Sequence, residues 1–241
     1  YEAIQKSYLH GEFIKQVNAL AKISAPPSGL TGAGRQISNI EIVIVPSCFT
    51  AGPLAWGYFV ESLRSQARRW GFTTDVIDTH PDFSLTQNAS LIEAYLKGRT
   101  AENIFLVSFS RGSAEVRMCL QRGQLAKSEL AKVKAWINVN GAVHGSLYAD
   151  LRSKEFFYRK FGPLLPKIFS YNARHDLELS KNFGIYRERF VLPNSMLMVN
   201  VLGLPLSHHI PIEVLSDFRS MQAAAGPNDS RVLLTDALIR P

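Results

Sequence analysis

The sequence is poor in the features that define several protein classes. Its 241 residues contain two cysteines, Cys48 and Cys119, too few for a disulfide framework, so free thiols are expected. No uncharged apolar run approaches the ~18 residues that span a bilayer, and no internal repeat or low-complexity tract is present. Because no His-x-x-x-His pair or carboxylate cluster has metal-ligand spacing, we predict neither a metal site nor a cofactor.

Export and nucleic-acid signals are also missing. The chain starts at Tyr1 without a basic stretch followed by an apolar core, so no signal peptide is expected. With free cysteines, this favours a cytoplasmic location. The net charge of +7 comes from Lys and Arg that are interleaved with acidic residues. This pattern is typical of solvated helix faces, so we expect no nucleic-acid binding.

The composition that is present, 46% hydrophobic and 20% charged, is typical of one globular domain with one sizeable core. Residues 1–39 differ from the rest. Phe13, Val17 and Leu20 recur at helical spacing, and a Pro/Gly/Ser-rich stretch follows them. We predict an N-terminal helical arm and linker over 1–39, which either packs on the core or docks a partner, and a single domain over 40–241.

Apolar strands alternate with amphipathic helices from residue 40 onward. The predicted strands are 40–45, 74–78, 104–107, 135–139 and 196–202, and the clearest helices are 56–70, 91–98 and 112–121. Such alternation is typical of a mostly parallel sheet with helices on both faces. We therefore predict an α/β fold.

The sharpest signal is a serine between a predicted strand and a predicted helix. Residues 106–113 (LVSFSRGS) fit the small-x-Ser-x-Gly nucleophile elbow, with Ser110 as the nucleophile. The turn is so tight that Ser108 and Gly112 must be small. The hydroxyl is then presented at the carboxyl end of the sheet, beside a helix N-terminus that favours developing negative charge. The alternative is that Ser110 merely caps the helix.

Acyl transfer also needs hydrogen-bond donors for the oxyanion. The backbone N–H of Arg111 directly follows the nucleophile. A second donor belongs in the loop after the first strand, where we predict the N–H of Cys48, with that of Phe49 as the alternative. Phe49 is also predicted to line the substrate pocket. The Cys48 thiol is a further candidate nucleophile, although no helix N-terminus or nearby histidine is evident to activate it.

These residues resemble bacterial α/β-hydrolase-fold serine hydrolases of the esterase and lipase type. The matching pieces, in chain order, are residues 44–46, 58–59, 88–89, 106–112, 140–146 and 227–229. The elbow is the specific motif among them, and it is also similar to the Phe-Ser-Arg-Gly elbow of some phospholipase-type effector hydrolases. Ser47 and Ser108 stand where the family commonly has glycine, but both are small. The resemblance spans about residues 40–241 and implies an α/β-hydrolase fold.

The resemblance also implies a triad acid. In these hydrolases an Asn-Asp-Gly segment near the chain end carries the carboxylate, and Asn228-Asp229-Ser230 stands in that place. Asp229 is therefore the predicted acid. From the residues alone, the same segment is a good turn and helix-capping string.

No histidine follows Asp229, although the usual chain order is serine, acid, histidine. Either the base lies beyond Pro241 in a longer polypeptide, or an internal histidine activates the serine. The best internal candidates are His209 and its neighbour His208, which follow the fifth predicted strand. His144, after the fourth strand, either lines the substrate pocket or makes structural hydrogen bonds.

The segment between the fourth and fifth predicted strands, about residues 146–193, is rich in aromatic and basic residues. It is expected either as a helical cap over an apolar pocket for a small-molecule acyl substrate, or as a helical layer that completes the core. We thus predict a serine hydrolase that cleaves a carboxylic ester or thioester through an acyl-enzyme on Ser110. The alternative is a hydrolase-fold binding or scaffold protein that lacks the triad histidine.

Overall fold

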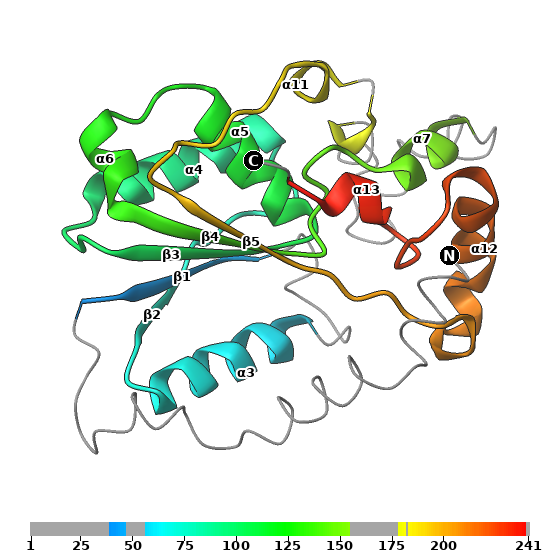
Figure 1. The fold of residues 1–241 in the computed structure, drawn as a ribbon, viewed down its shortest axis with the longest axis horizontal. Coiled ribbons are helices and arrows are strands. Elements are labelled where there is room, and N and C mark those ends of the chain that lie inside the picture. Colours follow the sequence, from blue (N-terminus) through cyan, green and yellow to red (C-terminus); the bar gives the residue numbers. More distant parts are fainter. Residues whose placement is uncertain (1–38, 47–55, 155–177, 182, 240–241) are drawn as a thin grey trace.

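The protein is seen in a computed structural model that describes residues 39–46, 56–154, 178–181 and 183–239 (Figure 1). At its centre is a parallel sheet of five strands: β1 (Glu41–Val45), β2 (Thr73–Val76), β3 (Ile104–Phe109), β4 (Val133–Val139) and β5 (Leu197–Val201). Their order across the sheet is β2-β1-β3-β4-β5. The five predicted strands are confirmed, with boundaries that shift by at most two residues.

Helices cover both faces of the sheet (Figure 1). One face carries α4 (Leu85–Gly98) and α5 (Arg111–Gln121), and the opposite face carries α3 (Trp56–Arg69). The short α6 (Lys127–Lys132) precedes β4, and α11 (Gly184–Arg187) lies over the α5 side. Beyond the carboxyl ends of the strands lie α7 (Leu147–Lys154), α12 (Ile212–Ala225) and α13 (Leu234–Ala237).

The helix α4 begins six residues earlier than its apolar pattern predicts. Ser84 accepts a hydrogen bond from the Gln87 backbone N–H at 3.1 Å, while the Gln87 side chain accepts one from the Ser84 N–H at 2.9 Å. This reciprocal capping box satisfies two N–H groups that the first turn leaves unpaired. The helix therefore starts at its cap rather than at its first apolar stripe.

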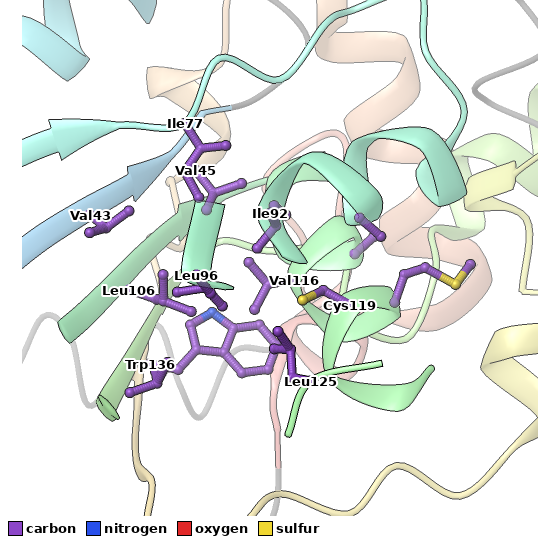
Figure 2. Close-up of a cluster of buried hydrophobic side chains, with 14 of the residues drawn as sticks. Val43, Val45, Ile77, Ile92, Leu96, Leu106, Val116, Cys119, Leu125 and Trp136 are labelled. Atoms are coloured by element: carbon purple, nitrogen blue, oxygen red, sulfur yellow. The ribbon is translucent and has the colours of Figure 1, made fainter. Parts of the chain in front are cut away.

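The main apolar core lies between the sheet and the α4–α5 layer (Figure 2). Val43, Leu106 and Trp136 project into it from three adjacent strands and are completely buried. A second cluster on the α3 side contains Ile44 and Val107. Because neighbouring residues of a strand point to opposite faces, apolar residues on both faces explain the uninterrupted apolar runs in the sequence.

The predicted cap segment is described in part. Leu179, Phe183 and Tyr186 pack against the main core cluster, and Ile185 is buried within it. This stretch is therefore a layer that completes the core. Residues 155–177, which hold the aromatic and basic run, lie outside the described residues, as do residues 1–38 of the predicted N-terminal arm. A cap formed by residues 155–177 stays a prediction.

Candidate active site

Ser110 alone joins β3 to α5, and its backbone is strained. Its φ of 47° and ψ of −118° lie outside the regions that L-residues ordinarily occupy. Neighbouring backbone holds the turn: the Ser110 N–H donates to the Val139 carbonyl at 3.3 Å, and the Ala142 N–H donates to the Ser110 carbonyl at 3.0 Å. Strain of this kind persists only where the surrounding structure imposes it, and such residues cluster at functional sites.

Gly112 permits the close approach of α5 to the end of β1. A Cβ atom on Gly112 would lie 2.4 Å from the Pro46 carbonyl oxygen and 2.7 Å from that of Val45. Both obstacles are backbone atoms at a strand end, so they cannot swing aside. The sequence argument that a small residue is needed two positions after Ser110 therefore agrees with the structure.

Ser108 occupies the place two residues before Ser110. Its side chain is completely buried, and its hydroxyl lies 2.7 Å from the Ser113 hydroxyl and accepts a hydrogen bond of 2.7 Å from Trp136 Nε1. A serine fits where the resembled family commonly has glycine because its polar atom is satisfied internally.

The Ser110 side chain is half-buried and makes no hydrogen bond to the backbone of α5. The interpretation of Ser110 as a simple helix cap is therefore wrong. A capping residue takes an extended backbone and accepts from the first turn, whereas Ser110 has a positive φ. Within the part of the chain that the structure describes, its hydroxyl has no hydrogen-bond partner.

The position of the turn in the sheet also matters. The chain leaves β1 for β2 on one side and reaches β3 and β4 on the other, so the direction of winding reverses between β1 and β3. In open parallel sheets, ligands bind beyond the carboxyl ends of the strands at such a switch point. Ser110 and Pro46 flank this point.

Asp229 lies in a tight turn that is tied to the end of β4. One carboxylate oxygen accepts hydrogen bonds from the N–H groups of Arg231 and Val232 at 2.9 and 2.7 Å. The other accepts one of 3.0 Å from the Asn140 side chain. Asn140 directly follows β4 and is itself bonded to Gly203, just past β5. The predicted acid is therefore held at the same sheet edge as Ser110.

Burial raises the pKa of the Asp229 carboxyl above its ordinary value, and the hydrogen bonds from Val232, Arg231 and Asn140 oppose that rise. Beside it is a cavity of about 10 Å³, which Asn140 and Gly203 also line. That is room for no more than one water molecule.

His208 and His209 form a single 3-10 turn after β5, η2 (Ser207–His209). Both side chains are exposed, and their ring centroids are 4.0 Å apart. Among the described residues, no hydrogen bond or ion pair joins either histidine to Asp229 or Ser110. The role of His209 as the base stays a prediction.

His144 is held in a network on both sides of its ring. Nε2 lies 3.0 Å from the Leu238 carbonyl oxygen, and Nδ1 lies 3.0 Å from Arg117 Nη1. Because a carbonyl only accepts and a guanidinium only donates, the ring carries its proton on Nε2. These two contacts fit the alternative that His144 makes structural hydrogen bonds. A role of His144 in lining the substrate pocket stays a prediction.

The remaining predicted positions divide in two. Arg111 begins α5, directly after Ser110, as the oxyanion prediction requires of its N–H. Cys48 and Phe49 lie outside the described residues. Cys119 is buried in the main core, where burial raises the pKa of its thiol well above the ordinary value. No group of three or more potential metal ligands occurs among the described residues.

Sequence reasoning gave no role to three residues that shape this edge. Asn140 positions Asp229, Ser113 contacts Ser108, and Gly141 packs so closely that its Cβ would lie 2.1 Å from the Ser113 hydroxyl. Asn140 and Gly141 stand in the resembled segment 140–146. The resemblance of that segment was a sequence signal for both residues, but it does not reveal their contacts, because the partners are distant in the sequence.

Solved structures with a similar fold include a metagenomic carboxyl esterase, with a TM-score of 0.66 and 20% identity over 86% of this chain and 64% of the esterase. The mature lipase BlEst2 of Bacillus licheniformis gives 0.61 and 21%, over 83% and 78%. The phospholipase PlaB of Legionella pneumophila gives 0.56 and 12%, over 83% and 44%. The chain thus spans less than two thirds of the esterase and of the phospholipase.

No protein-family model and no curated protein matches the sequence. At such identities the likeness shows the fold. The predicted α/β-hydrolase-like fold, a mostly parallel sheet with helices on both faces, is confirmed. Among the described helices, none combines the length and the apolar character that a bilayer crossing requires.

Proposed function

We propose that this protein is a serine hydrolase that cleaves a carboxylic ester or thioester through an acyl-enzyme on Ser110. The observation that carries the proposal is the strained turn itself. It places a half-buried hydroxyl without a described hydrogen-bond partner at the switch point of the sheet. The esterase, lipase and phospholipase named above share the fold and support this chemistry.

In the proposed reaction, Ser110 Oγ attacks the acyl carbonyl while a histidine takes its proton. The carbonyl oxygen becomes an oxyanion, which the N–H groups of Arg111 and Cys48 stabilise. The intermediate collapses, and the histidine returns the proton to the departing alcohol or thiol. Water then attacks the acyl-enzyme by the same route, which releases the acid and restores the serine.

Asp229 is the proposed acid, because its carboxylate is held by three hydrogen bonds at the edge where the reaction would occur. An ionised carboxylate beside the base stabilises the imidazolium that forms after proton transfer. Of the internal histidines, we propose His209 as the base, with His208 as its alternative.

The nucleophile is tested first. Ser110→Ala should lower kcat for p-nitrophenyl esters by about 10³-fold or more, since no other group replaces the attacking oxygen. It should also abolish labelling by a fluorophosphonate probe. Ser90→Ala, which removes an exposed hydroxyl on α4, is the matched control and should behave as the wild type. Equal labelling of the wild type and Ser110→Ala would refute the proposal.

The acid and base are tested together. Asp229→Asn should reduce kcat by about 10²-fold or more, because it removes the charge that stabilises the imidazolium. His209→Ala should reduce kcat at least as strongly, while His208→Ala should not. The pH dependence of kcat/KM should lose its lower limb in the base variant. If both histidine variants keep full activity, the base is a different residue.

A second candidate function is a hydrolase-fold protein that binds a ligand or partner without turnover. The observation in its favour is that no described contact joins a histidine to Asp229 or Ser110. It predicts that the wild type neither hydrolyses short-chain esters or thioesters nor reacts with the fluorophosphonate. Turnover that disappears in Ser110→Ala would exclude it.

A further inference from the structure

Arg111 carries a side chain that the proposed chemistry does not use. The guanidinium is only 1% exposed, although arginine is almost never fully buried unless it is paired. Its Nε lies 3.4 Å from a carboxylate oxygen of Glu115, one turn further along α5, and its Nη2 lies 3.8 Å from Glu178. The side chains of Arg111 and Glu115 are both buried, and Arg111 directly follows Ser110 in the chain.

The Arg111 guanidinium also donates hydrogen bonds to the loop between β2 and α4. Arg111 Nη1 donates to the Pro81 carbonyl at 3.0 Å, and Nη2 donates to the Phe83 carbonyl. A planar fork of five N–H donors can reach two carbonyls and a carboxylate together, which a lysine ammonium cannot do in the same geometry. One side chain thus ties the first turn of α5 to this loop.

Two other side chains hold the same loop. Asn88 donates to Glu115 at 2.7 Å and to the His80 carbonyl at 2.9 Å, and its own carbonyl accepts from the His80 N–H at 3.0 Å. Glu178 accepts from the Leu85 N–H, the first amide of α4, at 2.8 Å. The loop is therefore fixed by contacts from α4, from α5 and from the segment that precedes α11.

Stability alone does not explain such a cluster. Replacing a buried ion pair by apolar residues is often neutral or stabilising, because desolvation offsets the attraction. Burial raises the pKa of Glu115 to about 7, although Arg111 and the hydrogen bond from Asn88 lower it. Ionising this carboxyl in the folded protein therefore costs more free energy than ionising it in water. What the hydrogen bonds of the cluster do is connect the first turns of α5 to α4 and to the loop that precedes it.

We propose that Arg111 is a positioning residue: its buried side chain locks the first turn of α5 against the β2–α4 loop and so aims its own backbone N–H at the substrate oxygen above Ser110. This inference rests on the proposed function. A displacement of such a donor by about 1 Å can lower the rate by about 10²-fold. The reason is that the hydrogen bond from the N–H to the oxyanion accelerates the reaction only if it is stronger in the transition state than in the ground state.

The test compares four purified variants with the wild type on one p-nitrophenyl ester. Arg111→Lys keeps the charge beside Glu115 but loses the fork, and its kcat should fall by about 10-fold or more with KM within about 2-fold. Glu115→Gln leaves both loop carbonyls bonded to Arg111, so its loss should be the smaller one. The rate of fluorophosphonate labelling of Ser110 should follow kcat.

Arg122→Ala is the matched control. Arg122 also links α5 to α4, through the Thr86 carbonyl and the Ser90 hydroxyl, but it lies at the far end of α5. The kcat of Arg122→Ala should stay within about 2-fold of that of the wild type, since the hydrogen bonds of the Arg111 guanidinium are unchanged. The fourth variant, Arg111→Met with Glu115→Gln, removes both charges of the buried pair, while Glu178, whose side chain is 21% exposed, keeps its hydrogen bond from the Leu85 N–H. It is therefore expected to fold even if Arg111→Lys does not.

The double variant should reproduce the kcat loss of Arg111→Lys while its circular dichroism spectrum stays native. The inference is overturned if either folded Arg111 variant retains the wild-type kcat and labelling rate, or if Arg122→Ala loses as much. Failure of the proposed function has a different signature, because Ser110→Ala would then match the wild type whatever the Arg111 variants do.

Discussion

Glu115 shows how a single buried carboxyl links the candidate site to pH. Burial is the main cause of its raised pKa, and Glu178 adds to the rise, while Arg111 and the hydrogen bond from Asn88 lower it. Tyr186, half-buried in the same region, interacts electrostatically with these groups, and desolvation raises its own pKa. Ser108, in contrast, is a polar residue that the core accepts at little cost, because its hydroxyl is satisfied.

Glu115→Gln should therefore change how stability depends on pH. The pKa of Glu115 is about 7 in the folded state and about 4.3 in the unfolded chain. Between these values the folded state binds more protons, so the free energy of unfolding of the wild type should fall as pH rises through this window. The wild type should lose up to about 3 kcal/mol relative to Glu115→Gln between pH 4.5 and 8.

Urea unfolding at several pH values measures this difference. Glu102→Gln, at an exposed glutamate, is the control, and its curve should run parallel to that of the wild type. Parallel curves for Glu115→Gln and the wild type would contradict the prediction.

At the scale of elements, the contact between α5 and β1 decides whether the tight turn at Ser110 can form. The first turn of α5 crosses the carbonyls of Val45 and Pro46 with no space for a side chain at Gly112. Gly98, the last residue of α4, is the opposite case, because an added Cβ there meets nothing within 4 Å. The two glycines thus have different physical reasons to be where they are.

Gly112→Ala should destabilise the protein by about 3 kcal/mol or more, because the clash is with backbone and α5 must move. Gly98→Ala should be neutral or stabilise by up to about 1 kcal/mol, since alanine restricts the unfolded chain and favours the helix. Chemical unfolding of both variants checks this pair. Equal effects would mean that the approach of α5 to β1 is not tight.

At the scale of the whole molecule, the sheet is covered unevenly. Leu197, Val199 and Val201 alternate along β5 and are 63%, 37% and 46% exposed. They pair in register with Ala135, Ile137 and Val139 of β4, two of which pack in the α3-side cluster. Parallel sheets are normally buried on both faces, so this strip of β5 is an exposed apolar surface.

Replacing Leu197 and Val199 by Thr should leave the free energy of unfolding within about 0.5 kcal/mol, because little burial is lost. Self-association, followed by light scattering against concentration, should decrease. The control is Val107→Thr, on the same face but covered, where a buried hydroxyl should cost about 1 to 3 kcal/mol. Unchanged light scattering would show that the strip does not mediate contacts between copies.

The sequence alone determined the strands and the tight turn between β3 and α5, because both are local patterns. The apolar run at 104–107 predicts a buried strand, and the small residues around Ser110 predict a turn that admits nothing larger. It failed to predict α12, although Phe218 and Met221 of that helix are completely buried. Short apolar stripes of this kind carry little periodic signal.

The tertiary structure decided what meets at the carboxyl edge. Asn140 and Asp229 are 89 residues apart, and Glu178 reaches the Leu85 amide across 93 residues. The Arg111 guanidinium likewise donates a hydrogen bond to Pro81, which is 30 residues away in the sequence. Such contacts depend on strand order and on how each layer packs, and no local spacing encodes either. Physical proximity, rather than residue pattern, therefore assigns these side chains their partners.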